Sequence, residues 1–201
     1  MTQRSFQTTV ARLVIDPDFR DQVRAYGAMA LDGDLTALEQ ERVLSVVCDN
    51  GLDSTRTLHK SFRLTKIYTM LPLTRALLGP ARLARELGVF WKEELPVSHY
   101  FPEEAIAFCG FLQNRLRSGL RIKYLEEVVA YERANLELRQ PRTNGTSPEP
   151  QSVKFDHDPA SLFTQLLSGK PPRAVPPLSC RLVGSLRQDG EVQWDFATNS
   201  Q

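Results

Sequence analysis

The sequence predicts a mainly α protein with a small α+β unit at its C-terminal end. Helix-start signals and apolar side chains at helical spacing fill most of residues 1–138, and a proline-rich stretch follows at 139–151. Alternating apolar and polar residues, typical of strands, appear only after residue 152. We therefore expect an all-helical domain over 1–138, a linker over 139–151 and a small α+β subdomain over 152–201. That subdomain should be a three-stranded antiparallel sheet with one covering helix.

Two capping signals predict where early helices begin. Asp16 is followed by Pro17, which places a capping side chain before a proline at the first helical position. Thr36 and Glu39 have the spacing of a capping box, in which each side chain binds the backbone N–H of the other residue. We expect a helix after each signal.

The next helices are set by breaks and by apolar spacing. A long helix is expected from about Ser54 to Leu71, ended by Pro72, and Gly79-Pro80 should interrupt the helix that follows. Two later apolar stripes at helical spacing predict one helix after Pro102 and another after Gly119. They consist of Ala105, Phe108, Cys109, Leu112 and Leu116, and of Leu125, Val128, Val129 and Leu136.

The C-terminal unit reads as strand, helix and hairpin. The segment 152–157 is strand-like, and Asp158-Pro159 begins a short helix that Gly169 ends. The segment 181–196 alternates around Asp189-Gly190, a strong hairpin signal. Since an isolated hairpin is marginal in water, the first strand and the helix are expected to support it.

Composition and cysteine usage predict a cytoplasmic globular protein. Hydrophobic residues make up 41% of the chain and charged residues 24%, with a net charge of +1. No stretch approaches the roughly 18 apolar residues of a membrane span, and the N-terminal segment lacks a secretory signal pattern. Three widely spaced cysteines, Cys48, Cys109 and Cys180, argue against a disulfide framework.

No recognisable catalytic set is present, so we expect this chain not to be an enzyme on its own. The sequence has no HExxH, CxxC, phosphate-binding loop or nucleophile elbow. Asp156, His157 and Asp158 are adjacent, but neighbouring side chains of an extended segment point to opposite sides, and Asp158 already serves as a helix cap. The cysteines fit small buried hydrophobic positions better than a catalytic thiol. We expect no catalytic residue, metal site or cofactor in this chain, with a thiol or metal enzyme as the least favoured alternative.

A basic segment spans residues 56–85. It holds seven basic residues and no acidic one, and it follows a stretch, 32–53, with six acidic residues and one basic residue. The simpler interpretation is a solvated helix face neutralised by its acidic neighbour. The functional interpretation is a face that docks an acidic partner: protein, peptide or nucleic acid. The predicted partner-docking residues are Arg56, Lys60, Arg63 and Lys66.

The hairpin offers a second candidate surface. Its simpler interpretation is a C-terminal unit closed over itself, whereas a free strand edge would accept an extended peptide as another strand. Which outer edge would receive the peptide stays open at this point. The predicted peptide-binding edge residues are Arg181, Val183, Ser185, Glu191, Val192, Gln193, Trp194, Asp195 and Phe196.

Several segments resemble one known protein family. They are "TVARLVIDPDFRDQV", "LTALEQERV", "FPEEAIAF", "YLEEVVAYERANL" and "LFTQLLSGKP" followed by a strand pair. Together they resemble the non-catalytic partner proteins of multinuclear iron oxidases that modify ribosomally made peptides, in particular the methanobactin type. The resemblance covers most of the chain, but its motifs are helix patterns and transfer no single functional residue.

What the resemblance implies is a heterodimer with an iron-containing oxidase subunit. In that family the iron subunit converts a precursor cysteine into an oxazolone and a neighbouring thioamide, and the partner helps to hold the leader peptide. Iron is then expected in the partner subunit and no cofactor in this chain. The alternative is a helical regulator that binds nucleic acid through residues 56–85, because related partner families have been labelled DNA-binding. The net charge of +1 argues against it.

Overall fold

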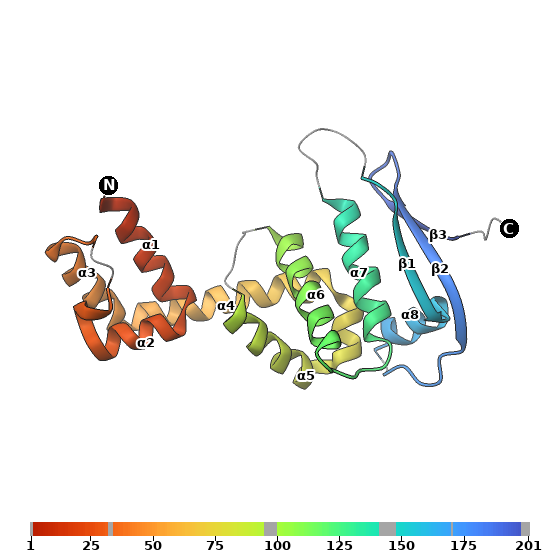
Figure 1. Cartoon of the computed structure of the whole chain (residues 1–201), viewed down its shortest axis with the longest axis horizontal. Coiled ribbons are helices and arrows are strands. Elements are labelled where there is room, and N and C mark those ends of the chain that lie inside the picture. The colour runs from red at the N-terminus through yellow and green to blue at the C-terminus, as the bar shows by residue number, and fades with distance from the viewer. Residues whose placement is uncertain (1, 32–33, 95–99, 141–147, 170, 198–201) are drawn as a thin grey trace. The chain divides into compact units, whose positions relative to one another are not determined.

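The computed structural model describes residues 2–31, 34–94, 100–140, 148–169 and 171–197. These residues form eight α-helices, one 3-10 helix and a three-stranded antiparallel sheet, which confirms the predicted fold class (Figure 1). The chain divides into two compact units, one of residues 1–65 and 91–96 and one of residues 66–90 and 97–201. We call them the N-terminal unit and the C-terminal unit and describe each by itself.

Short helices build the N-terminal unit, and both predicted caps are confirmed. The elements are α1 (Thr2–Ile15), α2 (Pro17–Tyr26), the 3-10 helix η1 (Gly27–Ala30), α3 (Ala37–Val47) and most of α4 (Asn50–Met70). Asp16 accepts a hydrogen bond from the backbone N–H of Phe19 at 2.9 Å, and Thr36 and Glu39 form the capping box. The core contains buried Leu13, Phe19, Val23, Leu35, Val43, Val47 and Leu52.

Helical segments form the first part of the C-terminal unit. They are the last turn of α4, most of α5 (Pro72–Glu93), α6 (Phe101–Arg117) and α7 (Leu125–Arg139). Gly79 has a φ of 66°, a left-handed conformation that suits glycine, and it interrupts α5 where the Gly79-Pro80 pair predicted a break. Both predicted apolar stripes lie on helices as expected: Ala105, Phe108, Cys109 and Leu112 are buried in α6, and Leu125, Val128, Val129 and Leu136 in α7.

The predicted strands, helix and turn of the C-terminal sheet are confirmed. They are β1 (Gln151–His157), α8 (Pro159–Leu167), β2 (Pro177–Leu186) and β3 (Val192–Phe196), and the strand order is β1-β2-β3. Asp158 caps α8 by accepting hydrogen bonds from the backbone N–H groups of Ala160 and Ser161. Gly190 has a φ of 82° in the hairpin turn, which explains the glycine after Asp189.

The sheet shares its core with α7, and this corrects the predicted domain boundary. Val153, Phe155 and Leu182 on one face of the sheet pack with Ala134 of α7. Figure 1 shows α7 alongside the sheet, with α8 at its lower end. Two helices rather than one therefore cover this face, and residues 152–201 belong to the same compact unit as α6 and α7. Residues 141–147 of the predicted linker lie outside the described part of the chain.

No helix in the described part of the chain combines the length and the apolar character needed to cross a membrane.

Candidate functional site

The strand order decides which predicted residues can offer a free edge. β2 lies between β1 and β3, so it has no outer edge. The carbonyl of Arg181 accepts from the N–H of Ala197, and Val183 and Ser185 pair with Asp195 and Gln193 of β3. The prediction that Arg181, Val183 and Ser185 form a peptide-binding edge is therefore wrong, because their backbone groups are used within the sheet. Their side chains lie on the face that α7 does not cover.

β3 does have an outer edge, and the alternation of backbone groups along the strand shows which residues point their N–H and C=O groups outward. The N–H of Arg187 donates to the carbonyl of Glu191, and the N–H of Ala197 donates to Arg181. Because successive backbone groups of a strand point to opposite sides, Gln193 and Asp195 also face β2. The backbone groups of Val192, Trp194 and Phe196 point outward. Of the predicted β3 residues, these three can pair with an added strand, and Glu191, Gln193 and Asp195 cannot.

Trp194 links this edge to the covering helices. Its ring lies so close over Gly184 of β2 that a Cβ built there would sit 2.8 Å from the indole. Its ring centroid is 4.9 Å from that of Tyr131, and its indole N–H donates to Asn135 at 3.4 Å. The Tyr131 ring in turn packs against that of Phe163 of α8, with ring centroids 4.5 Å apart and a tilt of 40°. A side chain placed beside Trp194 on this face would therefore meet α7 and α8.

A groove of about 460 Å³ opens beside Tyr131 and Asn135. Its walls come from α7, α8 and the α4–α5 junction, and we call it the apolar groove. Most of its lining is apolar: Met70, Pro72, Leu73, Tyr131, Leu136, Phe163 and Leu167. Leu167 is 72% exposed, and Phe196 on the neighbouring strand is 59% exposed. Exposed apolar side chains gathered at a groove are typical of binding surfaces.

Glu132 is the buried polar group of the apolar groove. Its carboxylate accepts hydrogen bonds from the backbone N–H groups of Leu73 at 2.7 Å and Thr74 at 2.9 Å. These donors lie in the first turn of α5, where a negative charge is favoured. Burial raises the pKa of Glu132 to about 7, against these hydrogen bonds, which lower it. Its role is thus to join α7 to the start of α5.

The outer edge of β1 is closed at one end by a carboxylate. The backbone N–H of Asp156 donates to Glu127 of α7 at 3.2 Å, which shows that Asp156 points its backbone outward. By alternation, Ser152 and Lys154 also point their backbone groups outward. A charged partner on an edge strand is a common way to protect it from pairing.

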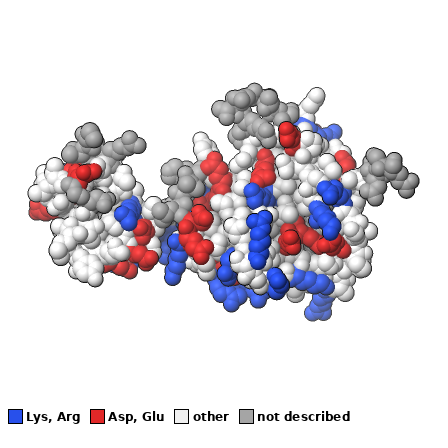
Figure 2. Space-filling model, in the orientation of Figure 1, with Lys and Arg blue, Asp and Glu red and all other residues white. Residues whose placement is uncertain are grey.

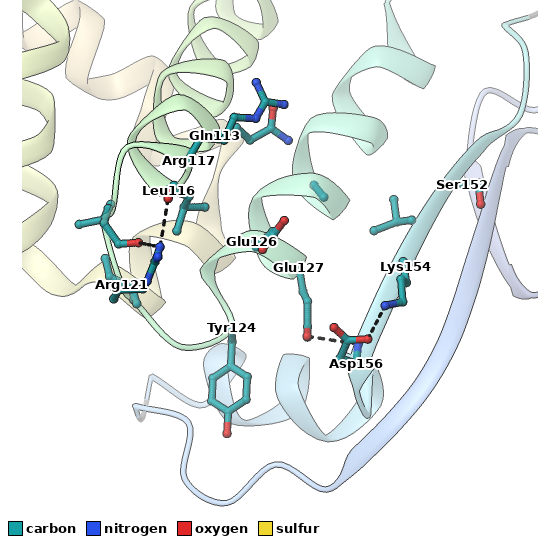
Figure 3. A pocket seen from close by; sticks show the side chains of 14 residues that line it. Gln113, Leu116, Arg117, Arg121, Tyr124, Glu126, Glu127, Ser152, Lys154 and Asp156 are labelled. Carbon is teal, nitrogen blue, oxygen red and sulfur yellow. Dashed lines mark hydrogen bonds and ion pairs between the residues drawn. The ribbon is translucent and has the colours of Figure 1, made fainter.

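A second groove, of about 600 Å³, runs along β1 between α6 and α7. We call it the polar groove. Figure 3 shows Lys154 and Asp156 on β1 facing Glu127 across it. Figure 2 shows side chains of both charges mixed over the same face of the C-terminal unit. Its charged lining residues are Arg117, Arg121, Glu126, Glu127, Lys154 and Asp156.

Most charges in the polar groove are paired within the protein. Lys154 binds Asp156 at 2.8 Å, and the guanidinium of Arg121 donates to the carbonyls of Leu116 and Leu120 at the end of α6. Glu127 also binds the imidazole Nδ1 of His157 at 2.8 Å. The three adjacent residues thus have three separate roles. Asp156 pairs with Lys154, His157 binds Glu127, and Asp158 caps α8. No metal-binding group of three such side chains occurs among the described residues.

Two of the four predicted docking residues are buried. Arg63 is 4% exposed: its guanidinium donates to the carbonyl of Glu94 at 3.1 Å and lies over the Trp91 ring. Lys66 is 2% exposed. Arg56 is half-buried and forms an ion pair with Asp53, and Lys60 alone of the four is exposed. The prediction of a continuous basic docking face on α4 is therefore wrong, because helical spacing alone does not tell which face is covered.

The three cysteines lie in different environments, and only Cys109 is fully buried. Cys109 is buried, and burial raises the pKa of its thiol far above the ordinary value. Burial also raises the pKa of the half-buried Cys180, while Cys48 is exposed.

Sequence reasoning missed the α7 and α8 side of the site. Tyr131 and Asn135 have the i, i+4 spacing of one helix face, a signal that could have placed them together, but nothing local connects them to Trp194.

Searches against family models and curated proteins found no match for this chain. The fold and the two grooves therefore carry the functional argument.

Proposed function

We propose that this chain is a non-catalytic binding subunit that holds an extended peptide by β-strand addition to β3. The observation that carries the proposal is the outward-facing backbone of Val192, Trp194 and Phe196, for which the described residues supply no hydrogen-bond partner. An added strand would take up these groups, and main-chain hydrogen bonds would supply affinity with little dependence on sequence.

The two outer edges are not equivalent, and the difference favours β3. At β1, Glu127 occupies the Asp156 N–H, and an ion pair lies along the strand. At β3, the neighbouring side chains are Trp194 and the exposed Phe196. The charges of β3 and its turn, Glu191 and Asp195, alternate with these side chains along the strand, so the face of β3 that α7 covers is apolar at its edge. An apolar edge face favours a partner strand, whereas a charged edge resists one.

The resemblance supports a specific peptide and partner. By this proposal the peptide is the leader of a ribosomally made precursor, and an iron-containing oxidase subunit converts a precursor cysteine into an oxazolone and a thioamide. The oxidation then takes place on the partner, and this chain contributes binding and positioning. Iron belongs to the oxidase subunit in this scheme.

The N-terminal unit supplies the docking surface for the oxidase in this proposal. Its described residues expose five large apolar side chains: Tyr26, Met29, Leu38, Leu58 and Phe62. Their exposure supports a protein contact better than the partly buried basic residues of α4 do. The alternative nucleic-acid function has lost its main support, since Arg63 and Lys66 are buried.

The test compares proline at the two edges. Proline removes a backbone N–H, so Val192→Pro should weaken binding of the precursor about tenfold, measured by fluorescence anisotropy. Val192→Ala controls for the lost side chain. Ser152→Pro removes an outward N–H from β1 and should leave binding unchanged.

The proposal predicts that a short cysteine-containing precursor and an iron oxidase are encoded beside this chain, and that precursor is the probe. Equal affinity of Val192→Pro and Val192→Ala would contradict the β3 edge, and a loss confined to Ser152→Pro would move the site to β1. Neighbouring reading frames that encode neither component would contradict the proposed peptide and partner.

A further inference from the structure

We infer that the apolar groove is a specificity pocket, which receives one large apolar side chain of the peptide strand paired with β3. The inference rests on the proposed strand addition and names the class of peptide that this edge would select: one with a leucine, isoleucine, methionine or phenylalanine at a fixed position.

The strand register identifies that position. In an antiparallel pair, a residue that exchanges both hydrogen bonds with its neighbour has its side chain on the same face of the sheet. The backbone of Trp194 points outward, and its side chain lies on the face covered by α7. The peptide residue opposite Trp194 therefore directs its side chain to that same face.

The contacts of Trp194 show what this side chain would meet. Tyr131 and Asn135, which touch Trp194, are also two of the residues that line the apolar groove. The groove therefore begins one side chain away from the edge strand and continues toward Phe163 and Leu167. Continuity between the edge and the groove is the reason for assigning the groove to the peptide.

The lining determines the chemistry of the occupant. Two of the polar groups of the groove are already engaged, because Glu132 binds the start of α5 and Asn135 binds the Trp194 indole. The other polar lining residues, Thr69 and Arg139, lie at exposed positions. A polar side chain placed beside Tyr131 and Phe163 would therefore leave water for few new hydrogen-bond partners. An apolar side chain would bury its surface against Tyr131, Phe163 and the exposed Leu167.

The experiment is selection of random 12-residue peptides displayed on phage against the immobilised full-length protein. Wild type should enrich peptides with a large apolar residue at one position flanked by alternating residues. Replacing that residue by alanine in a selected peptide should weaken binding about tenfold or more.

Two variants change the groove and keep β3 intact. Leu167→Asp places a charge at its exposed rim, and Thr69→Trp fills it from an exposed position on α4. Peptides selected by either variant should no longer share a large apolar residue at one position. Leu178→Asp, which changes an exposed leucine at the start of β2, is the control and should still select such peptides.

The outcomes separate this inference from the proposed function. Unchanged apolar preference in Leu167→Asp and Thr69→Trp, together with loss of all enrichment in Val192→Pro, would overturn the pocket and leave strand addition standing. Enrichment that survives Val192→Pro, or none with wild type, would overturn strand addition and with it the pocket.

Discussion

The two outer strands of the C-terminal sheet lie on either side of the same helix, α7, yet they face different surroundings. Beside β1 the groove is polar, and Lys154, Asp156, Glu127 and Arg121 have partners within the protein. On the β3 side the groove is mostly apolar, and Trp194 of β3 contacts two of its lining residues, Tyr131 and Asn135. Both edges have outward backbone groups without a partner among the described residues, so the side chains around each edge, rather than its backbone, distinguish the two.

Each groove also has a carboxylate from α7, and the two are used differently. Glu127 is partly exposed and closes the β1 edge, whereas Glu132 is buried and joins α7 to α5.

The largest effect is expected in the core that the sheet shares with α7 and α8. Phe155 is fully buried between Tyr131 and Phe163, so Phe155→Ala should destabilise the C-terminal unit by about 3–5 kcal/mol. Hydrogen–deuterium exchange should show lost protection in α7 as well as in the sheet. Leu178→Ala, at an exposed position, is the control. Protection retained in α7 would mean that the sheet folds apart from the helices, as the sequence predicted.

Glu132 should make the C-terminal unit less stable as the pH rises. Its pKa is raised from 4.5 to about 7 by burial, so the folded state binds more protons than the unfolded state between these values. The stabilisation is fully present below about pH 4.5 and is lost as the pH rises through about 7, by about 3 kcal/mol at most.

Amide exchange of α7, measured from pH 5 to 8 and corrected for intrinsic rates, should follow that loss. Glu132→Gln keeps an acceptor for one of the two α5 donors and should remove the dependence. An equal slope in Glu132→Gln would show that another group is responsible.

Gly184 should control the position of Trp194. Because an added Cβ would sit 2.8 Å from the indole, Gly184→Ala should displace the ring and cost about 2 kcal/mol. The emission of Trp194, recorded in a Trp91→Phe background, should shift toward that of an exposed indole. Ser185→Ala, the next residue on the opposite face, should leave the emission unchanged. If both variants behave alike, Trp194 is not held by Gly184.

The smallest effect is expected at the β1 side. Glu127→Gln removes the charge beside His157 but keeps an acceptor for the Asp156 N–H, so the stability should change by less than about 1 kcal/mol. Peptide affinity should stay at the wild-type value. A loss as large as that of Val192→Pro would place the peptide in the polar groove.

Local signals explain which sequence predictions succeeded. Asp16-Pro17, the Thr36/Glu39 box, Asp158-Pro159 and Asp189-Gly190 each act within a few residues, and the structure confirms all four. The prediction of a basic docking face on α4 was wrong because burial of its residues depends on distant contacts. Helical spacing placed Arg63 on one line with Lys60, but the contacts that bury Arg63 come from Trp91 and Glu94, about thirty residues away.

The sequence by itself determined the helices, the three strands and their caps, because these depend on backbone hydrogen bonds and side chains that are neighbours along the chain. Only the tertiary structure decided that β2 is central, that the outward backbone groups of β3 belong to Val192, Trp194 and Phe196, and that α7 joins Glu132 to α5 and Tyr131 to Trp194. Those contacts join residues about sixty positions apart, and such pairs leave no periodic pattern in the sequence.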